Sequence, residues 1–330
     1  MPKPSPISAT VDFDRDGKQH GFLNLPYSRD DSAWGSIMMP ITVIKNGVGP
    51  TAFLVGGNHG DEYEGQVALL KAAAEIDAAS LNGRIIILPS LNFPAVQAGS
   101  RTSPIDKGNM NRSFPGRPDG GVTEKIADYV QRHILPLADY VLDIHSGGRT
   151  LEFLPLAACH VLPDKSQEER AVAAVTAFGA PNSMMMLEID SAGMLDTAVE
   201  ELGKVFVTTE LGGGGSLTVR TLAIAERGMR NFLVHAGISS GRIEQLPSRW
   251  LKMPDCDCFV IGVDRGLIEP CVDLGEPVAK GQIVARIHDF ERTGRAPAEY
   301  RARRDGILTG RHFPGRVQPG DCLAVIAVAG

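Results

Sequence analysis

His59 and Glu62 are two potential metal ligands that lie three residues apart where a strand gives way to a helix. The apolar run 52–55 predicts a buried strand, and Gly56 and Gly57 then turn the backbone sharply. Both side chains could converge above the carboxyl edge of a sheet, where open α/β folds bind their ligands. An imidazole and a carboxylate at that place suit zinc if one more ligand arrives from elsewhere. The alternative is a surface loop in which Glu62 is favoured only by the dipole of the following helix.

A second apolar strand, residues 140–144, ends in His145 and a glycine turn. We expect His145 to be the third ligand, because zinc catalysts commonly use two histidines and one glutamate. Asp143 lies two residues earlier and therefore faces the same side of the strand. Its carboxylate could hold the other ring nitrogen of the histidine. It could equally be an ordinary polar residue at a strand end.

A third apolar strand, residues 204–209, ends in Glu210, which precedes a leucine and four glycines. A carboxylate beside such a flexible backbone suits a general base that acts on water at a metal site. The first strand is followed by a histidine and a glutamate, the second by a histidine and the third by a glutamate. Such a series is difficult to attribute to chance.

The loop 101–116 contains Arg101, Arg112, Asn109 and Asn111. Two arginines and two asparagines form a poor core element but a good clamp for a carboxylate or an oxyanion. The alternative is a solvated loop with scattered charge.

Alternating strands and helices surround these residues from about 51 to 237, which predicts an α/β fold with a mixed sheet flanked by helices. The first 48 residues show short strands and turns, which predict an antiparallel addition at the sheet edge. The expected helices are 66–77, 123–137, 166–178, 194–203 and 222–236.

The last part of the chain, from about residue 246, predicts an all-β domain of short strands separated by glycine and proline. A repeated Val-x-x-Gly-(Gln/Asp)-x-(Val/Leu) pattern resembles the small β-sandwich of biotin and lipoyl carrier domains. A carrier would present a modified lysine at a hairpin, but the corresponding turn, 288–294, has none. We therefore predict a catalytic domain, 1–245, and a β-domain, 246–330, that covers the active-site entrance.

The order of the polar residues along the strands resembles the zinc carboxypeptidase superfamily. Within that superfamily the chain is similar, over nearly its whole length, to the succinylglutamate desuccinylase/aspartoacylase family, which hydrolyses small N-acyl amino acids. The residues that carry this resemblance are His59-x-x-Glu62, Asn111-Arg112, His145 and Glu210.

The resemblance implies a zinc-carboxypeptidase-like fold and one Zn²⁺ per chain, with three ligands: His59, Glu62 and His145. It implies that Glu210 is the catalytic base and also protonates the leaving amine. Arg101 would polarise the scissile carbonyl, and Asn111 and Arg112 would bind the α-carboxylate of the substrate.

Aspartoacylases hold the side-chain carboxylate of their substrate with an arginine ten residues before the catalytic glutamate. That count leads here to Glu200, and Asp196 lies one turn earlier on the same helix face. Acidic groups at this place would repel N-acetylaspartate and attract a substrate that bears an ammonium group. The alternative is a solvated helix face.

The resemblance further implies the hydrolysis of N-acetyl-2,4-diaminobutyrate to acetate and 2,4-diaminobutyrate in ectoine breakdown. Succinylglutamate desuccinylase or aspartoacylase-type activity on another N-acyl amino acid is the first alternative. A metallocarboxypeptidase would need an open funnel for a polypeptide. A binding module built on the carrier-like domain would have no need for Glu210 beside three metal ligands.

Composition narrows the partners of this 330-residue chain. Its net charge of −6 and its low aromatic content, without a basic stripe, argue against nucleic-acid binding. No signal peptide or membrane-length apolar run is present in the sequence, so no membrane association is expected. Five cysteines without a secretory signal predict reduced thiols in the cytoplasm. Cys256 and Cys258 could suggest a metal site, but no partner pair lies nearby in the sequence, so we expect them to be structural. A homo-oligomer is compatible with the sequence.

Overall fold

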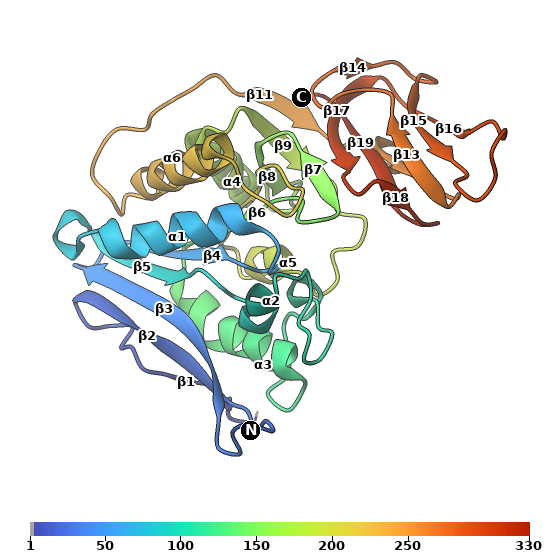
Figure 1. The fold of residues 1–330 in the computed structure, drawn as a ribbon. Coiled ribbons are helices and arrows are strands. Elements are labelled where there is room, and N and C mark those ends of the chain that lie inside the picture. The colour runs from blue at the N-terminus through green and yellow to red at the C-terminus, as the bar shows by residue number, and fades with distance from the viewer. Residues whose placement is uncertain (1–2) are drawn as a thin grey trace.

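Three parallel strands form the middle of a large mixed sheet in the computed structural model, which describes residues 3–330 (Figure 1). They are β4 (Thr51–Gly56), β6 (Tyr140–His145) and β10 (Val205–Glu210), and β6 lies between the other two. Nearly all of their side chains are buried, as expected for parallel strands covered on both faces. Their carboxyl ends therefore meet at one edge of the sheet.

The sheet extends on both sides of these strands. Next to β4 lies β5 (Gly83–Leu88), which runs parallel to it. Three antiparallel strands follow toward the edge: β3 (Ser36–Asn46), β2 (Gly17–Pro26) and β1 (Ser8–Ala9). Next to β10 lies β8 (Leu156–His160), which runs antiparallel to it. β9 (Asn182–Met186) pairs in parallel with β8, and β11 (Arg249–Lys252) pairs in parallel with β9.

Helices cover both faces of the sheet and form two apolar cores (Figure 1). One face carries α1 (Tyr63–Glu75), α4 (Lys165–Phe178) and α6 (Val219–His235). The other face carries α2 (Phe93–Ala98), α3 (Val122–Tyr129) and α5 (Leu195–Glu200).

Two helices are shorter than the sequence predicts. The expected helix 123–137 leaves α-geometry after Tyr129 and continues as a π-turn (Val130–Ile134) and a 3₁₀ turn (Leu135–Leu137). Pro136 lacks a backbone N–H and cannot continue an α-helical ladder. The expected helix 194–203 ends at Glu200, and Gly203 follows with a φ of +72°. Further 3₁₀ turns span Ala78–Ser80, Met110–Arg112 and Cys256–Cys258.

The C-terminal region is an all-β sandwich, as predicted. Its four-stranded sheet contains β13 (Gly266–Pro270), β15 (Ile283–His288), β16 (Ala298–Arg301) and β18 (Arg316–Val317). The facing layer contains β12 (Phe259–Ile261), β14 (Pro277–Val278), β17 (Gly306–His312) and β19 (Cys322–Ala329). A separate apolar cluster, including Val284, Val317 and Ile326, fills the space between them.

The second layer of the sandwich is continuous with the large sheet, because β19 pairs with β11 and β17 pairs with β7 (Leu151–Phe153). Hydrogen bonds therefore cross between the α/β region and the sandwich, and the division at 245/246 stays a prediction. Between residues 3 and 330 we find no helix that is both long and apolar enough to cross a membrane.

Candidate metal centre and active site

The three central strands bring the predicted ligands and the predicted base to one edge of the sheet. His145 and Glu210 are paired residues in the parallel register of β6 and β10. His59 and Glu62 lie in the turn between β4, the other neighbour of β6, and α1. Gly57 makes this turn with a φ of +65°, a left-handed conformation that glycine adopts without steric cost.

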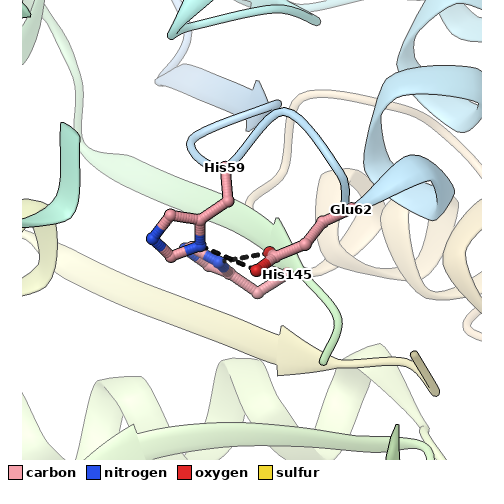
Figure 2. A group of neighbouring side chains, drawn as sticks. All are labelled: His59, Glu62 and His145. Carbon is pink, nitrogen blue, oxygen red and sulfur yellow. Dashed lines mark hydrogen bonds and ion pairs between the residues drawn. The ribbon is translucent and has the colours of Figure 1, made fainter. Parts of the chain in front are cut away.

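The carboxylate of Glu62 contacts both histidines, whose rings lie next to each other (Figure 2). Its Oε1 is 2.7 Å from Nδ1 of His59, and its Oε2 is 2.7 Å from Nδ1 of His145. All three side chains are buried, and their possible ligand atoms lie within 4.8 Å of one another. Two imidazoles and one carboxylate are a ligand set that zinc catalysts use. This group could therefore hold a metal ion.

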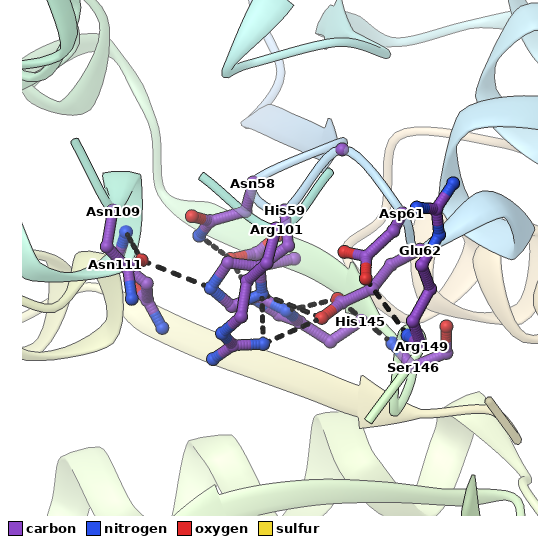
Figure 3. A network of polar contacts seen from close by, with 12 residues as sticks. Asn58, His59, Asp61, Glu62, Arg101, Asn109, Asn111, His145, Ser146 and Arg149 are labelled. Carbon is purple, nitrogen blue, oxygen red and sulfur yellow. Dashed lines mark hydrogen bonds and ion pairs between the residues drawn. The ribbon is translucent and has the colours of Figure 1, made fainter. Parts of the chain in front are cut away.

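The second nitrogen of each imidazole has its own partner (Figure 3). Nε2 of His59 lies 3.2 Å from the side-chain oxygen of Asn109, and Nε2 of His145 lies 2.9 Å from Asp143. Asn58 donates a hydrogen bond of 2.8 Å to the same oxygen of Asp143. Such contacts fix the orientation of the rings and leave both Nδ1 atoms directed at one point.

Burial and neighbouring charges set the protonation of this group. Burial lowers the pKa of His59, and the cation of Arg101 acts in the same direction. Burial would also lower the pKa of His145, but the carboxylates of Asp143 and Glu62 raise it well above its usual value. Burial would raise the pKa of Glu62, but the two imidazoles hold it well below its usual value. An ionised Glu62 and a neutral His59 are the forms that bind metal.

Glu210 is a buried carboxylate with the properties of a general base beside a cation site. Its Oε2 is buried and has no hydrogen-bond partner among the residues described. Burial, followed by the charge of Glu62, raises the pKa of Glu210 to about 8. A positive ion at the Glu62 carboxylate would lower that pKa toward neutrality, where a general base is most effective. The unpaired oxygen and the donor set together fit a divalent metal.

The long loop contributes its predicted side chains to the same place. Nη1 of Arg101 lies 3.3 Å from Nδ1 of His59 and 3.4 Å from Glu62 (Figure 3). Asn111 and Arg112 lie in a 3₁₀ turn of this loop. The side-chain oxygen of Asn111 accepts a hydrogen bond of 2.9 Å from the first backbone amide of α5, which ties the loop to that helix.

One cavity joins nearly all of these groups, and it is lined by both polar and apolar side chains, as a small-molecule site is. The predicted residues that line it are His59, Glu62, Arg101, Asn111, Arg112, Asp143, His145 and Glu210. Glu200 is not among the lining residues. It lines a neighbouring cavity and lies 2.8 Å from Nδ1 of His160. Asp196 lines both cavities.

Sequence reasoning assigned no role to Glu188 or Asn58, and it included Asn109 only in the anion clamp of the loop 101–116. Glu188 also lines the cavity and follows β9, so an apolar run that ends in a carboxylate could have revealed it. Asn58 and Asn109 lie close in the sequence to predicted site residues. An asparagine at such a position has no sequence signal that predicts its contact with the metal site.

The fold and this site define a family. A sequence profile of the succinylglutamate desuccinylase/aspartoacylase catalytic domain matches residues 48–236. The chain belongs to this family, which confirms the resemblance seen in the sequence. It is also 58% identical to the N-alpha-acetyl-L-2,4-diaminobutyric acid deacetylase of Halomonas elongata, over 98% of this chain and 96% of that protein.

Solved structures agree with this assignment. The product-bound structure of the ectoine utilization protein EutE (DoeB) from Ruegeria pomeroyi is similar with a TM-score of 0.98 and 61% identity, over 99% of each chain. A succinylglutamate desuccinylase/aspartoacylase from Rhodobacter sphaeroides is similar with a TM-score of 0.94 and 39% identity, over 99% of this chain and 100% of that one. The predicted zinc-carboxypeptidase-like α/β fold is therefore confirmed.

Proposed function

We propose that this protein hydrolyses N-acetyl-2,4-diaminobutyrate to acetate and 2,4-diaminobutyrate in the breakdown of ectoine. One observation carries the proposal: Glu210, with an oxygen that has no partner among residues 3–330, shares a cavity with a ligand set for a metal ion. The 58% identity to a deacetylase of this substrate supports the choice of amide. The similarity to an ectoine utilization protein supports the pathway.

The cofactor that we propose is one zinc ion per chain, held by His59, Glu62 and His145. When bound, zinc acts as a Lewis acid toward the acyl carbonyl and lowers the pKa of water toward about 7. Two nitrogens and one carboxylate oxygen are the donors that support zinc over magnesium or calcium, which prefer oxygen ligands.

The protein's own groups then perform the proton transfers. Glu210 takes a proton from the attacking water while the oxygen of that water forms a bond to the acyl carbon. The guanidinium of Arg101 stabilises the negative charge that develops on the carbonyl oxygen. Glu210 returns the proton to the amide nitrogen as the carbon–nitrogen bond breaks. Acetate and the free amine leave.

The α-carboxylate of the substrate would bind to Asn111 and Arg112. Arginine pairs with carboxylates through two parallel hydrogen bonds, which orients as well as binds them. Both residues line the cavity that contains Glu210. An N-acyl amino acid with a free α-carboxylate would therefore be preferred over an internal peptide bond.

We place the reaction in the cytoplasm, where the five free thiols of the chain would stay reduced. The β-sandwich would restrict the entrance. Phe259, Cys322 and Val325 line a cavity that shares Arg112 and Glu210 with the catalytic one.

A substrate screen of the zinc-loaded protein tests this function. N-acetyl-2,4-diaminobutyrate should be hydrolysed with release of acetate, faster than N-succinylglutamate, N-acetylaspartate or a peptide with a free carboxyl terminus. Preferential release of a C-terminal amino acid from the peptide would identify a carboxypeptidase instead. Preference for N-succinylglutamate would assign a desuccinylase.

A further inference from the structure

A second group of titratable side chains faces the catalytic cavity. Glu188 and Asp196 line the cavity of Glu210 and also the neighbouring cavity, which contains His160 and Glu200. Glu188 therefore shares a cavity with the catalytic carboxylate.

Negative charge exceeds positive charge in this group. The possible ligand atoms of His160, Glu188 and Asp196 lie within 4.8 Å of one another, and Asp196 is only 5% exposed. Glu200 holds Nδ1 of the imidazole at 2.8 Å, whereas Glu188 lies 3.5 Å from Nε2. That Nε2 is buried without a hydrogen-bond partner among the described residues. Three carboxylates stand against one imidazole, so even a protonated ring leaves negative charge uncompensated.

Titration of the group agrees with this excess. Burial acts against protonation of His160, but the nearby carboxylates of Glu188 and Glu200 raise its pKa to about 10. Burial, together with the charges of Glu188 and Glu200, raises the pKa of Asp196 to about 6. The shift of Asp196 reflects its burial beside other carboxylates.

We propose that Glu188 and Asp196 bind the side-chain ammonium of the substrate, an inference that rests on the proposed deacetylase function. They face the cavity that also contains Arg112, so an amino acid could be bound by its carboxylate and its ammonium at once. Two buried carboxylates would gain from a primary ammonium, which is a compact donor of three hydrogen bonds. A substrate with a side-chain carboxylate would be repelled.

Glu200 is a positioning residue in this arrangement. It holds the His160 ring, which stacks on Phe206 with an interplanar angle of 11°. Phe206 lines the catalytic cavity, so the imidazole is fixed between the acidic group and the cavity wall. Asp196 is fixed independently by its Oδ1, which accepts hydrogen bonds from the backbone and hydroxyl groups of Thr197. Glu200 thus acts on the substrate through His160.

A pair of matched substrates tests the ammonium site. N-acetylnorvaline has the shape of N-acetyl-2,4-diaminobutyrate, with a methyl group in place of the ammonium. The zinc-loaded wild type should prefer the diamine in kcat/KM by about 10- to 100-fold, as expected for hydrogen bonds between charged groups. Asp196→Asn and Glu188→Gln should each reduce this preference by about 10-fold or more. Glu201→Gln, an exposed position beside Glu200, should keep it.

The remaining outcomes separate the competing explanations. Equal use of both substrates by wild type would overturn the ammonium site and leave the deacetylase intact, whereas hydrolysis of neither would refute the deacetylase itself. A second metal ion per chain that is lost in Asp196→Asn would make the group a metal site. Glu200→Gln should raise KM for the diamine and change kcat little. A greater loss of preference in Glu200→Gln than in Asp196→Asn would make Glu200 the direct contact.

Discussion

Charged side chains are arranged in opposite ways at the central strand ends and on the β-sandwich. At the strand ends, Glu62 and both of its histidines are buried, and one oxygen of Glu210 has no partner in the part of the chain that the structure describes. On the sandwich, Glu269 pairs with Arg286 at 3.0 Å and with His288 at 2.6 Å, and all three side chains are at least a third exposed.

This difference in burial distinguishes charged groups that serve function from charged groups that only face solvent. Burial of ionisable groups costs free energy, so a buried group with unmet hydrogen-bonding capacity indicates a ligand or a reaction. Exposed ion pairs are screened by water and contribute little to stability. Substitutions should therefore have large effects at the strand ends and small effects on the sandwich.

The largest effect is expected from the ligands. His59→Ala, Glu62→Ala or His145→Ala should each abolish activity and metal content together, because each removes a donor from a set of three. Metal analysis of each purified variant, alongside acetate release, checks this. A variant that keeps both a full metal complement and activity would remove that residue from the ligand set.

The next largest effect separates the base from the ligands. Glu210→Gln should keep the metal and lose about 10²- to 10⁴-fold in kcat, because an amide of similar shape cannot accept the proton. Metal content and turnover should be measured on the same sample. Loss of metal from this variant would make Glu210 a ligand, and full turnover would remove it as the base.

A smaller effect should distinguish the two arginines. Arg112→Ala should chiefly raise KM, because the substrate carboxylate is present in both ground and transition states. Arg101→Ala should chiefly lower kcat, because the oxyanion exists only along the reaction path. Changes of about 10- to 100-fold are expected for each charged contact. Equal effects of both substitutions on both constants would contradict the two roles.

The smallest effect is expected on the sandwich. Glu269→Gln removes the carboxylate from an exposed group of charges, so kcat/KM and the midpoint of thermal unfolding should stay unchanged within error. Steady-state kinetics and a thermal melt measure both quantities. A marked loss of activity would show that the sandwich surface takes part in catalysis, and the contrast between the two regions would fail.

The sequence predicted the strand ends well because each carries a strong local signal. An apolar run that ends in His59, His145 or Glu210 is visible without any knowledge of the neighbouring strands. Helix lengths were less predictable where local chemistry intervenes, as at Pro136 and Gly203.

What could not be predicted depends on contacts between distant parts of the chain. The pairing of β11 with both β9 and β19 is a long-range choice, and nothing local in the run 249–252 specifies it. The count of ten residues back from Glu210 led to Glu200, but the short α5 directs Glu200 to His160 and brings Asp196 to the catalytic cavity. Such a difference is set by the position of the helix, which spacing along the chain does not fix.

Removal and return of the metal tests the central claim most directly. The purified protein is stripped with a chelator, and acetate release from N-acetyl-2,4-diaminobutyrate is followed while zinc is added back in known amounts. We predict no hydrolysis by the stripped protein and full recovery at one zinc ion per chain. Full hydrolysis by the metal-free protein, or saturation of zinc binding without recovery of hydrolysis, would contradict the account.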